Sequence, residues 1–147
     1  MKQSVTEEIT IRHARSIADY LFLRTLRNQV RQSMTNDTGL VTLLQQARFF
    51  LTRPASLDVY VAWLGSRRAG YLLLRRVETT TLITEAVEPA CRRMGVAAMI
   101  VRHAQKRHAN LTAEIRSGNA ASLALHVSAG FVPVNTIGDV QILRFTR

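Results

Sequence analysis

The sequence predicts one mixed α/β domain, residues 1–147, built on a single central sheet that is partly antiparallel and flanked by helices. The first observation behind this prediction is the order of the expected elements, β-α-α-β-β-β-α-β-α-β-β. The second is size and composition, because 147 residues that are 47% hydrophobic suffice for one compact core. The third is that no repeat, low-complexity tract or linker divides the chain.

The first half of the chain predicts a strand, two helices and a meander of three strands. Ser16 is a typical helix N-cap, and Pro54 disfavours helix in the residue before it. Thr35–Gly39 and Gly65–Arg68 have the residue types of turns. The expected elements are a strand over Val5–Arg12, a helix over Ile17–Met34 that breaks near Asn28, a helix over Val41–Leu51, and strands over Leu57–Leu64, Ala69–Val77 and Thr79–Val87.

In the second half, helices alternate with strands. Val96, Ile100 and Ala104 recur at helical spacing, and Gly130 is placed to end a later helix. The expected elements are a helix over Gly95–His108, a strand over Leu111–Ile115, a helix over Ala120–Ala129, and a hairpin of Phe131–Asn135 and Asp139–Phe145 around Gly138.

The chain is strongly basic, with a formal net charge of +10. Nearly all of its basic residues are arginines, since lysine occurs only at Lys2 and Lys106. This balance favours an anionic partner such as nucleic acid, a phosphorylated cofactor or an acidic substrate. A solvated surface that simply prefers arginine explains it equally well, because the arginines are scattered along the sequence.

Other features narrow the class of protein. No apolar run is long enough to span a bilayer, and the N-terminal residues lack a secretory apolar segment, so we expect a cytoplasmic protein. Cys91 is the only cysteine, which excludes an internal disulfide. The histidines show no metal-ligand spacing, and we expect no metal site.

The strongest motif is the segment Val87–Ala97, where a strand ends, a basic loop follows and a helix begins at a glycine. The first amides of a helix lack intrahelical partners and favour an anion, and Gly95 and Ala97 leave room for one to approach. Arg92 and Arg93 add positive charge and hydrogen-bond donors. The segment therefore predicts either a pyrophosphate site or a basic loop with a glycine needed for its geometry.

Two blocks of the sequence resemble the GNAT (GCN5-related N-acetyltransferase) superfamily. Arg92-x-x-Gly95-x-Ala97 resembles the acetyl-CoA loop of that superfamily, and Val87-x-Pro89 before it matches as well. The second block is Glu114-Ile115-Arg116-x-x-Asn119-x-x-Ser122-x-x-Leu125-His126-x-x-x-Gly130-Phe131. The close resemblance covers about residues 79–134.

The resemblance implies a GNAT-like fold with acetyl-CoA as cosubstrate, bound in a gap where two strands splay apart. Backbone groups of Glu85, Ala86 and Val87 would bind the pantetheine arm, and Asn119, with Ser122 on the same helical face, would contact the cofactor. The amides of the loop would hold the pyrophosphate; these belong to Arg93, Met94, Gly95, Val96, Ala97 and Ala98, with Arg92 beside them.

The resemblance also suggests catalytic residues. Family members usually carry a tyrosine where this chain has His126, which is either an acid for the departing thiolate or a packing residue. Glu114 is the first choice as base, because its stretch is similar to that of ribosomal-protein N-terminal acetyltransferases, and Glu85 is the second choice. An ion pair with an arginine is an equal alternative for each glutamate.

The leading functional hypothesis is an N-acetyltransferase that uses acetyl-CoA and acts on an amino sugar, a small amine or a protein N-terminus. The alternative hypothesis is a GNAT scaffold that binds nucleic acid or modifies an amine carried by a nucleic acid or nucleotide. Salt-dependent binding to nucleic acid would separate the two hypotheses. The sequence leaves open whether two copies form a homodimer.

Overall fold

The computed structural model describes residues 7–31, 42–52 and 54–147. Its elements are β1 (Ile9–His13), α1 (Ile17–Gln29), α2 (Leu43–Thr52), β2 (Leu57–Leu64), β3 (Arg67–Val77), β4 (Thr80–Val87), α3 (Val96–Arg107), β5 (Asn110–Arg116), α4 (Ala120–Ser128), β6 (Val132–Ile137) and β7 (Val140–Thr146). The described strands form one sheet in the order β1-β2-β3-β4-β5-β7-β6. Only β4 and β5 pair in parallel within this sheet. The predicted mixed α/β fold and the order of its elements are therefore confirmed.

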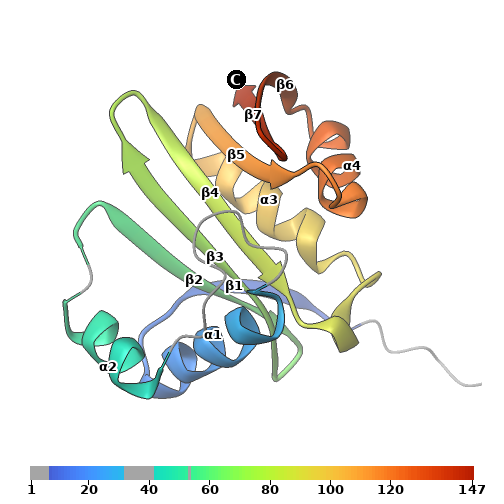
Figure 1. Ribbon diagram of the computed structural model, residues 1–147. Coiled ribbons are helices and arrows are strands. Elements are labelled where there is room, and N and C mark those ends of the chain that lie inside the picture. The colour runs from blue at the N-terminus through green and yellow to red at the C-terminus, as the bar shows by residue number, and fades with distance from the viewer. Residues whose placement is uncertain (1–6, 32–41, 53) are drawn as a thin grey trace, which may run out of the picture.

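Helices cover the two faces of the sheet in two pairs (Figure 1). On one face, α1 buries Tyr20, Leu23 and Leu26 against alternate residues of β2, β3 and β4. On the other face, α3 buries Val96, Ile100, Val101 and Ala104, and Leu123 and Leu125 of α4 pack beside them. Because neighbouring strand residues point to opposite faces, each central strand contributes to both cores.

The boundaries differ from the predicted ones mainly at turns. The turn between β2 and β3 uses only Gly65 and Ser66, so Arg67 and Arg68, expected in the turn, already belong to β3. Gly65 adopts a φ of 61°, which suits a residue without a side chain. The break expected near Asn28 is present, since α1 ends at Gln29. The turn at 35–39 and the start of the first predicted strand lie outside the described residues.

The sequence did not indicate two further features. Pro89–Cys91 forms a short 3-10 turn between β4 and the loop that leads to α3. The final hairpin is inserted so that β7, not β6, pairs with β5. Sequence order alone does not fix this choice, because either strand of a terminal hairpin could lie beside the sheet.

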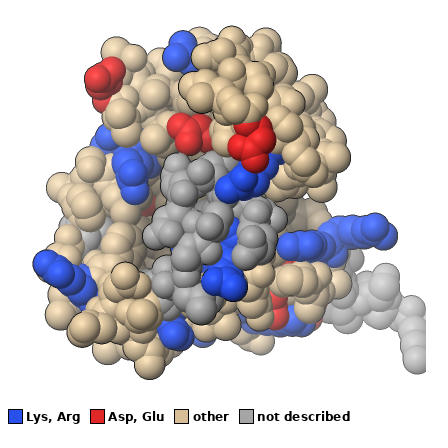
Figure 2. All heavy atoms as spheres, in the orientation of Figure 1, with Lys and Arg blue, Asp and Glu red and all other residues tan. Residues whose placement is uncertain are grey.

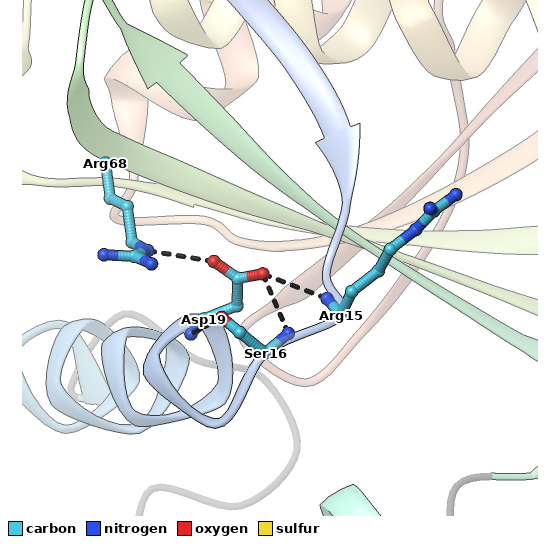
Figure 3. Close-up of polar contacts among 4 residues, drawn as sticks. All are labelled: Arg15, Ser16, Asp19 and Arg68. Carbon is cyan, nitrogen blue, oxygen red and sulfur yellow. Dashed lines mark hydrogen bonds and ion pairs between the residues drawn. The ribbon is translucent and has the colours of Figure 1, made fainter.

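Asp19 fixes the start of α1 to the sheet (Figure 3). Its carboxylate accepts hydrogen bonds from the backbone amides of Arg15 and Ser16, while Ser16 caps the helix by accepting from the Asp19 amide. The other carboxylate oxygen accepts from Nε of Arg68 on β3 at 2.9 Å. The Arg68 guanidinium also stacks on Trp63 of β2, 4.6 Å from the ring centroid. This arginine therefore has a structural role.

His103 of α3 is a half-buried titratable group whose Nε2 atom is buried. Its ring packs edge-on against Tyr60, and its Nε2 has no hydrogen-bond partner among the described residues. Burial, together with the nearby charge of Arg107, lowers the pKa of His103 to about 4. Its imidazole is therefore neutral in the folded protein at neutral pH.

We predict that His103→Phe will reduce acid destabilisation. A histidine whose pKa is lower in the folded state takes up its proton more readily when unfolded, so its contribution to stability is complete above pH 6.5 and is lost as the pH falls toward 4. The measurement is the thermal unfolding midpoint of both proteins between pH 4 and pH 8. Parallel pH dependences in the wild type and the variant would contradict this role.

Candidate active site

The site begins where β4 and β5 separate. The two strands pair at Thr81 with Leu111, Leu82 with Thr112 and Ile83 with Ala113, and no register continues beyond this point although both strands do. Figure 1 shows them diverging. Past Ile83, the edge of β4 that faces β5 therefore has no strand partner, and its backbone groups are available to a ligand.

The close contact between Gly70 of β3 and the backbone of β4 indicates which backbone groups of β4 face this gap. A Cβ at Gly70 would lie 2.6 Å from the carbonyl oxygen of Ala86, so that oxygen points toward β3. Backbone groups alternate in direction along a strand, and Glu85 and Val87 consequently direct theirs toward the gap. Of the three residues predicted to bind the pantetheine arm, two are oriented to do so, and Ala86 faces the other way.

The loop before α3 has an unusual backbone. Arg93 and Gly95 both adopt positive φ angles, 63° and 85°. Gly95 is the N-cap of α3 and has no side chain that could accept hydrogen bonds from the first helical amides. The first amide of α3 that donates within the helix is that of Met99, which bonds to the carbonyl oxygen of Gly95. By contrast, the side chains of Ser16 and Asn119 cap α1 and α4. The amides that open α3 are therefore free to bind an anion such as a pyrophosphate.

These features border a cavity of about 590 Å³. It extends from the end of β4 along the loop to α4. Its walls contain Val30, Glu85, Val87, Cys91, Arg92, Arg93, Gly95, Val96, Ala97, Ala98, Asn119, Ala121, Ser122 and Leu125. Uncapped amides and arginines at one end and an open strand edge at the other fit the phosphates and the amide-containing arm of a CoA thioester.

The cavity includes most of the residues predicted to bind the cofactor, and it omits some. Met94 does not line it and is 55% exposed, because the loop turns its side chain outward. The side chain of Ala86 is buried against α1. Sequence reasoning did not identify four further wall residues, which are Val30, Cys91, Ala121 and Leu125. Leu125 could have been found from its helical spacing of three residues from Ser122, whereas nothing in the sequence indicated Val30.

Glu85 and His126 form an ion pair across the gap. The Nε2 atom of His126, on α4, lies 2.8 Å from Oε1 of Glu85, on β4. The contact is short but bent, and by angle it is not a well-formed hydrogen bond. His126 is only 1% exposed and packs edge-on against Phe131, whereas Glu85 lines the cavity. A ligand therefore meets Glu85 first, with His126 behind it.

The surroundings of His126 favour its charged form. Its Nδ1 lies 2.7 Å from the carbonyl oxygen of Ser122, which can only accept, so Nδ1 carries a proton. In a neutral ring, the Nε2 lone pair would then face the carboxylate of Glu85. Burial opposes a second proton, but the contact with Glu85 and its negative charge outweigh this, and the pKa of His126 is raised.

Glu114 lies on the other side of the sheet from this pair. Leu111, Ala113 and Ile115 of β5 face the core beneath α3 and α4, so Glu114 points to the opposite face, where it is exposed. It does not line the cavity. Arg116, two residues further along the same sequence block, pairs with Asp139 at 2.8 Å. The structure therefore brings Glu85 and His126 together and leaves Glu114 apart from them.

Comparison with known proteins identifies the family. The profile of the acetyltransferase (GNAT) family matches residues 22–131, about three quarters of the chain. The chain belongs to the GNAT acetyltransferase family. As a member, it is an N-acetyltransferase that uses acetyl-CoA as its cosubstrate. No curated protein matches the chain by sequence.

Solved structures share the fold. A putative acetyltransferase, yncA, from Salmonella typhimurium with acetyl-CoA is similar with a TM-score of 0.76 and 20% identity, over 94% of this chain and 93% of that one. Spermidine N-acetyltransferase from Vibrio cholerae in complex with CoA and spermine has a TM-score of 0.82 and 13% identity, over 94% and 95%. Ribosomal-protein-alanine N-acetyltransferase from Brucella melitensis has a TM-score of 0.73 and 26% identity, over 94% and 98%.

Two further observations concern partners. No helix among residues 7–31, 42–52 and 54–147 is long and apolar enough to cross a membrane. On the face shown in Figure 2, lysine and arginine side chains are dispersed and do not form a continuous basic strip. Neither the comparisons nor this face supports a nucleic-acid partner.

We predict that Gly95→Glu will weaken acetyl-CoA binding by at least about tenfold, because a carboxylate would face the pyrophosphate across the uncapped amides. Gly138→Glu is the matched control. Gly138 has a similar positive φ of 60° and open space around it, so a glutamate there meets similar backbone strain at a residue that does not line the cavity. Calorimetric titration with acetyl-CoA gives both affinities. Equal affinities in two folded variants would place the cofactor elsewhere.

Proposed function

We propose that this acetyltransferase acetylates the α-amine of a protein N-terminus, with the Glu85–His126 pair as the acid and Glu114 as the base. The observation that carries the mechanism is the 2.8 Å contact between the two side chains at the wall of the cavity. It provides a proton held next to the end of the strand along which the pantetheine arm would lie.

The acid step follows from the arrangement of the pair. When the C–S bond breaks, the thiolate of CoA takes up a proton. The carboxylate of Glu85 is the member of the pair that reaches the cavity, so the proton passes from Nε2 of His126 through Glu85 to the sulfur. His126 acts through Glu85 and is in this sense a positioning residue and proton reservoir. Because the pKa of His126 is raised, its imidazole stays protonated up to a higher pH than that of an ordinary histidine.

The base step belongs to the other face of the sheet. An amine attacks only after the ammonium has lost its proton, and a carboxylate already paired with an imidazolium is a poor acceptor for it. Glu114 is exposed and has no such partner among the described ion pairs. It lies on the strand across the gap from Glu85, so it would receive the proton from an acceptor that approaches this face, directly or through water.

The acceptor is proposed from two observations. The relative from Brucella melitensis that acts on ribosomal-protein alanine shares 26% identity over nearly the whole length of both chains. The stretch Glu114–Arg116 is similar to the corresponding stretch of such enzymes. A polyamine such as spermine fits less well, because a chain with a net charge of +10 repels a polycation.

We predict that Glu85→Gln will lower kcat by up to about 10², within the usual range of acid catalysis. The amide keeps a donor for His126 but carries no proton to release. In the wild type, kcat should fall as the pH rises through the raised pKa of His126, because the pair then loses its proton. The variants Glu85→Gln and His126→Phe should lack this alkaline decline, so the difference in kcat between each variant and the wild type should shrink at high pH. Steady-state kinetics of thiol release between pH 6 and pH 10 measures both effects.

One kinetic result would contradict the assignment of His126 to the acid pair. Affinity for acetyl-CoA should stay nearly unchanged in His126→Phe, because the ring does not line the cavity. If His126→Phe keeps the full kcat and the alkaline decline of the wild type, His126 is a packing residue only.

We predict that peptides with a free N-terminal alanine will be acetylated and that N-terminally blocked peptides will not. Glu114→Gln should lower kcat for these peptides by about 10²–10⁴, and less at high pH, where more of the amine is already neutral. Glu78→Gln, in the exposed turn between β3 and β4, is the control carboxylate. Mass spectrometry locates the acetyl group. Acetylation of spermine or an amino sugar in place of the peptides would overturn the proposed acceptor.

A further inference from the structure

Tyr71 of β3 has an unexplained hydroxyl. Its side chain is 1% exposed, and its hydroxyl has no hydrogen-bond partner among the described residues. A buried hydroxyl that makes no hydrogen bond is costly, and folded proteins rarely keep one without a reason. A phenylalanine at this position would fill nearly the same space without that cost. The mechanism above does not use Tyr71.

The position of Tyr71 relates its hydroxyl to the gap. Tyr71 lies opposite Ala86 in the register of β3 and β4, and both side chains face α1. The side chain of Ala86 is small, and a phenol is long enough to cross the spacing of about 4.8 Å between strands. The charges of Arg27 on α1 and Glu85 on β4 both act on the hydroxyl. Tyr71 therefore packs beneath α1 next to Ala86, close enough to feel the charge of Glu85, whose side chain lines the cavity.

The surroundings keep this phenol a hydrogen-bond donor. Burial is the main effect and raises the pKa of Tyr71 far above its usual value; the negative charge of Glu85 acts in the same direction, against the positive charge of Arg27. The hydroxyl does not ionise at any pH at which the enzyme works. Tyr71 is not itself a lining residue of the cavity, but Val30, at the end of α1, lines it and packs against the core cluster that contains Tyr71.

We propose that the hydroxyl of Tyr71 donates a hydrogen bond to the carbonyl oxygen of the acetyl group and stabilises it as negative charge develops there. An acceptor amine need not carry any oxygen, but the thioester always brings this one to the gap. When the amine nitrogen bonds to the carbonyl carbon, the π electron pair moves to the oxygen. When the C–S bond breaks, the C=O bond re-forms and the thiolate takes its proton from the Glu85–His126 pair.

This inference rests on the proposed mechanism, but not on the identity of the acceptor. A neutral donor in a buried place, near the positive charge of Arg27, suits an oxyanion because it needs little reorganisation as the charge appears. The proposed acid and the proposed oxyanion donor then lie on opposite faces of the sheet, since the Glu85–His126 pair lies beneath α4 and Tyr71 lies beneath α1.

The test is Tyr71→Phe, with Tyr60→Phe as the matched control. Tyr60 is a buried tyrosine on the other face that packs against His13 and His103, away from the cavity. Tyr71→Phe should lower kcat by about 10²–10³, the usual cost of removing one such donor. The KM for the acceptor should stay unchanged, and the affinity for acetyl-CoA should fall much less than kcat, because the hydrogen bond strengthens as negative charge develops on the oxygen. The unfolding midpoint should stay equal or rise, because the lost hydroxyl had no partner.

A second measurement does not depend on turnover. The carbonyl carbon of ¹³C-labelled acetyl-CoA should resonate further downfield when bound to the wild type or to Tyr60→Phe than when bound to Tyr71→Phe, because a hydrogen bond polarises the carbonyl. Equal resonances overturn the proposal, even if no acceptor has been found. An unchanged kcat, a raised acceptor KM with kcat preserved, or a lowered unfolding midpoint in Tyr71→Phe also overturns it.

Discussion

The site depends on the early end of the parallel pairing between β4 and β5. The two strands share a register only as far as Ile83 and Ala113. Had it continued, the backbone of Glu85 and Val87 would bond to β5, and no edge would remain for a ligand. The antiparallel pairs on either side hold each strand in place, so the two can diverge without fraying. The loop before α3 then begins at the open end of β4, which places an anion site beside the unpaired edge.

The Glu85–His126 pair connects the two halves of the sheet that diverge. Glu85 belongs to β4, and α4 follows β5, so the contact bridges the gap near its inner end. The resemblance to the GNAT superfamily implied a tyrosine at the position of His126, and a phenol can release its proton without a partner. An imidazole that already donates to the carbonyl of Ser122 needs a carboxylate to hold a second proton. The histidine and the glutamate are therefore best understood as one functional unit.

Much of the fold could be predicted from the sequence, because local signals were strong. Ser16, Gly95 and Gly130 lie at or beside the ends of helices, and the apolar strands 57–64 and 80–87 lie within one residue of their predicted bounds. The cofactor loop was found because its chemistry depends on consecutive residues. The order of β6 and β7 was not predicted, since it depends on packing between distant segments.

The pairing within the site was harder to predict for the same reason. Glu85 and His126 are separated by a strand, a helix and a loop, and each was identified as a separate candidate. Their contact depends on the angle at which α4 packs, and that angle is not encoded in any short motif. The buried position of His126 behind Glu85 was equally invisible, so the sequence indicated an imidazole that meets the thiolate directly. Tyr71 carried no signal at all, because an apolar strand with one tyrosine is typical of a core.

The alternation of side chains along β4 and β5 explains how two glutamates can have opposite tasks. Glu85 points to the face beneath α4 and shares a proton with an imidazole, whereas Glu114 points to the opposite face and meets solvent. If both carboxylates lay on one face, each would raise the pKa of the other, and neither an acid nor a base would be well defined. In the proposed mechanism, the sheet keeps them apart and each glutamate moves a proton on its own face. In this arrangement, the proton of the amine leaves on one face and the proton for the thiolate arrives from the other, so the two transfers need no common group.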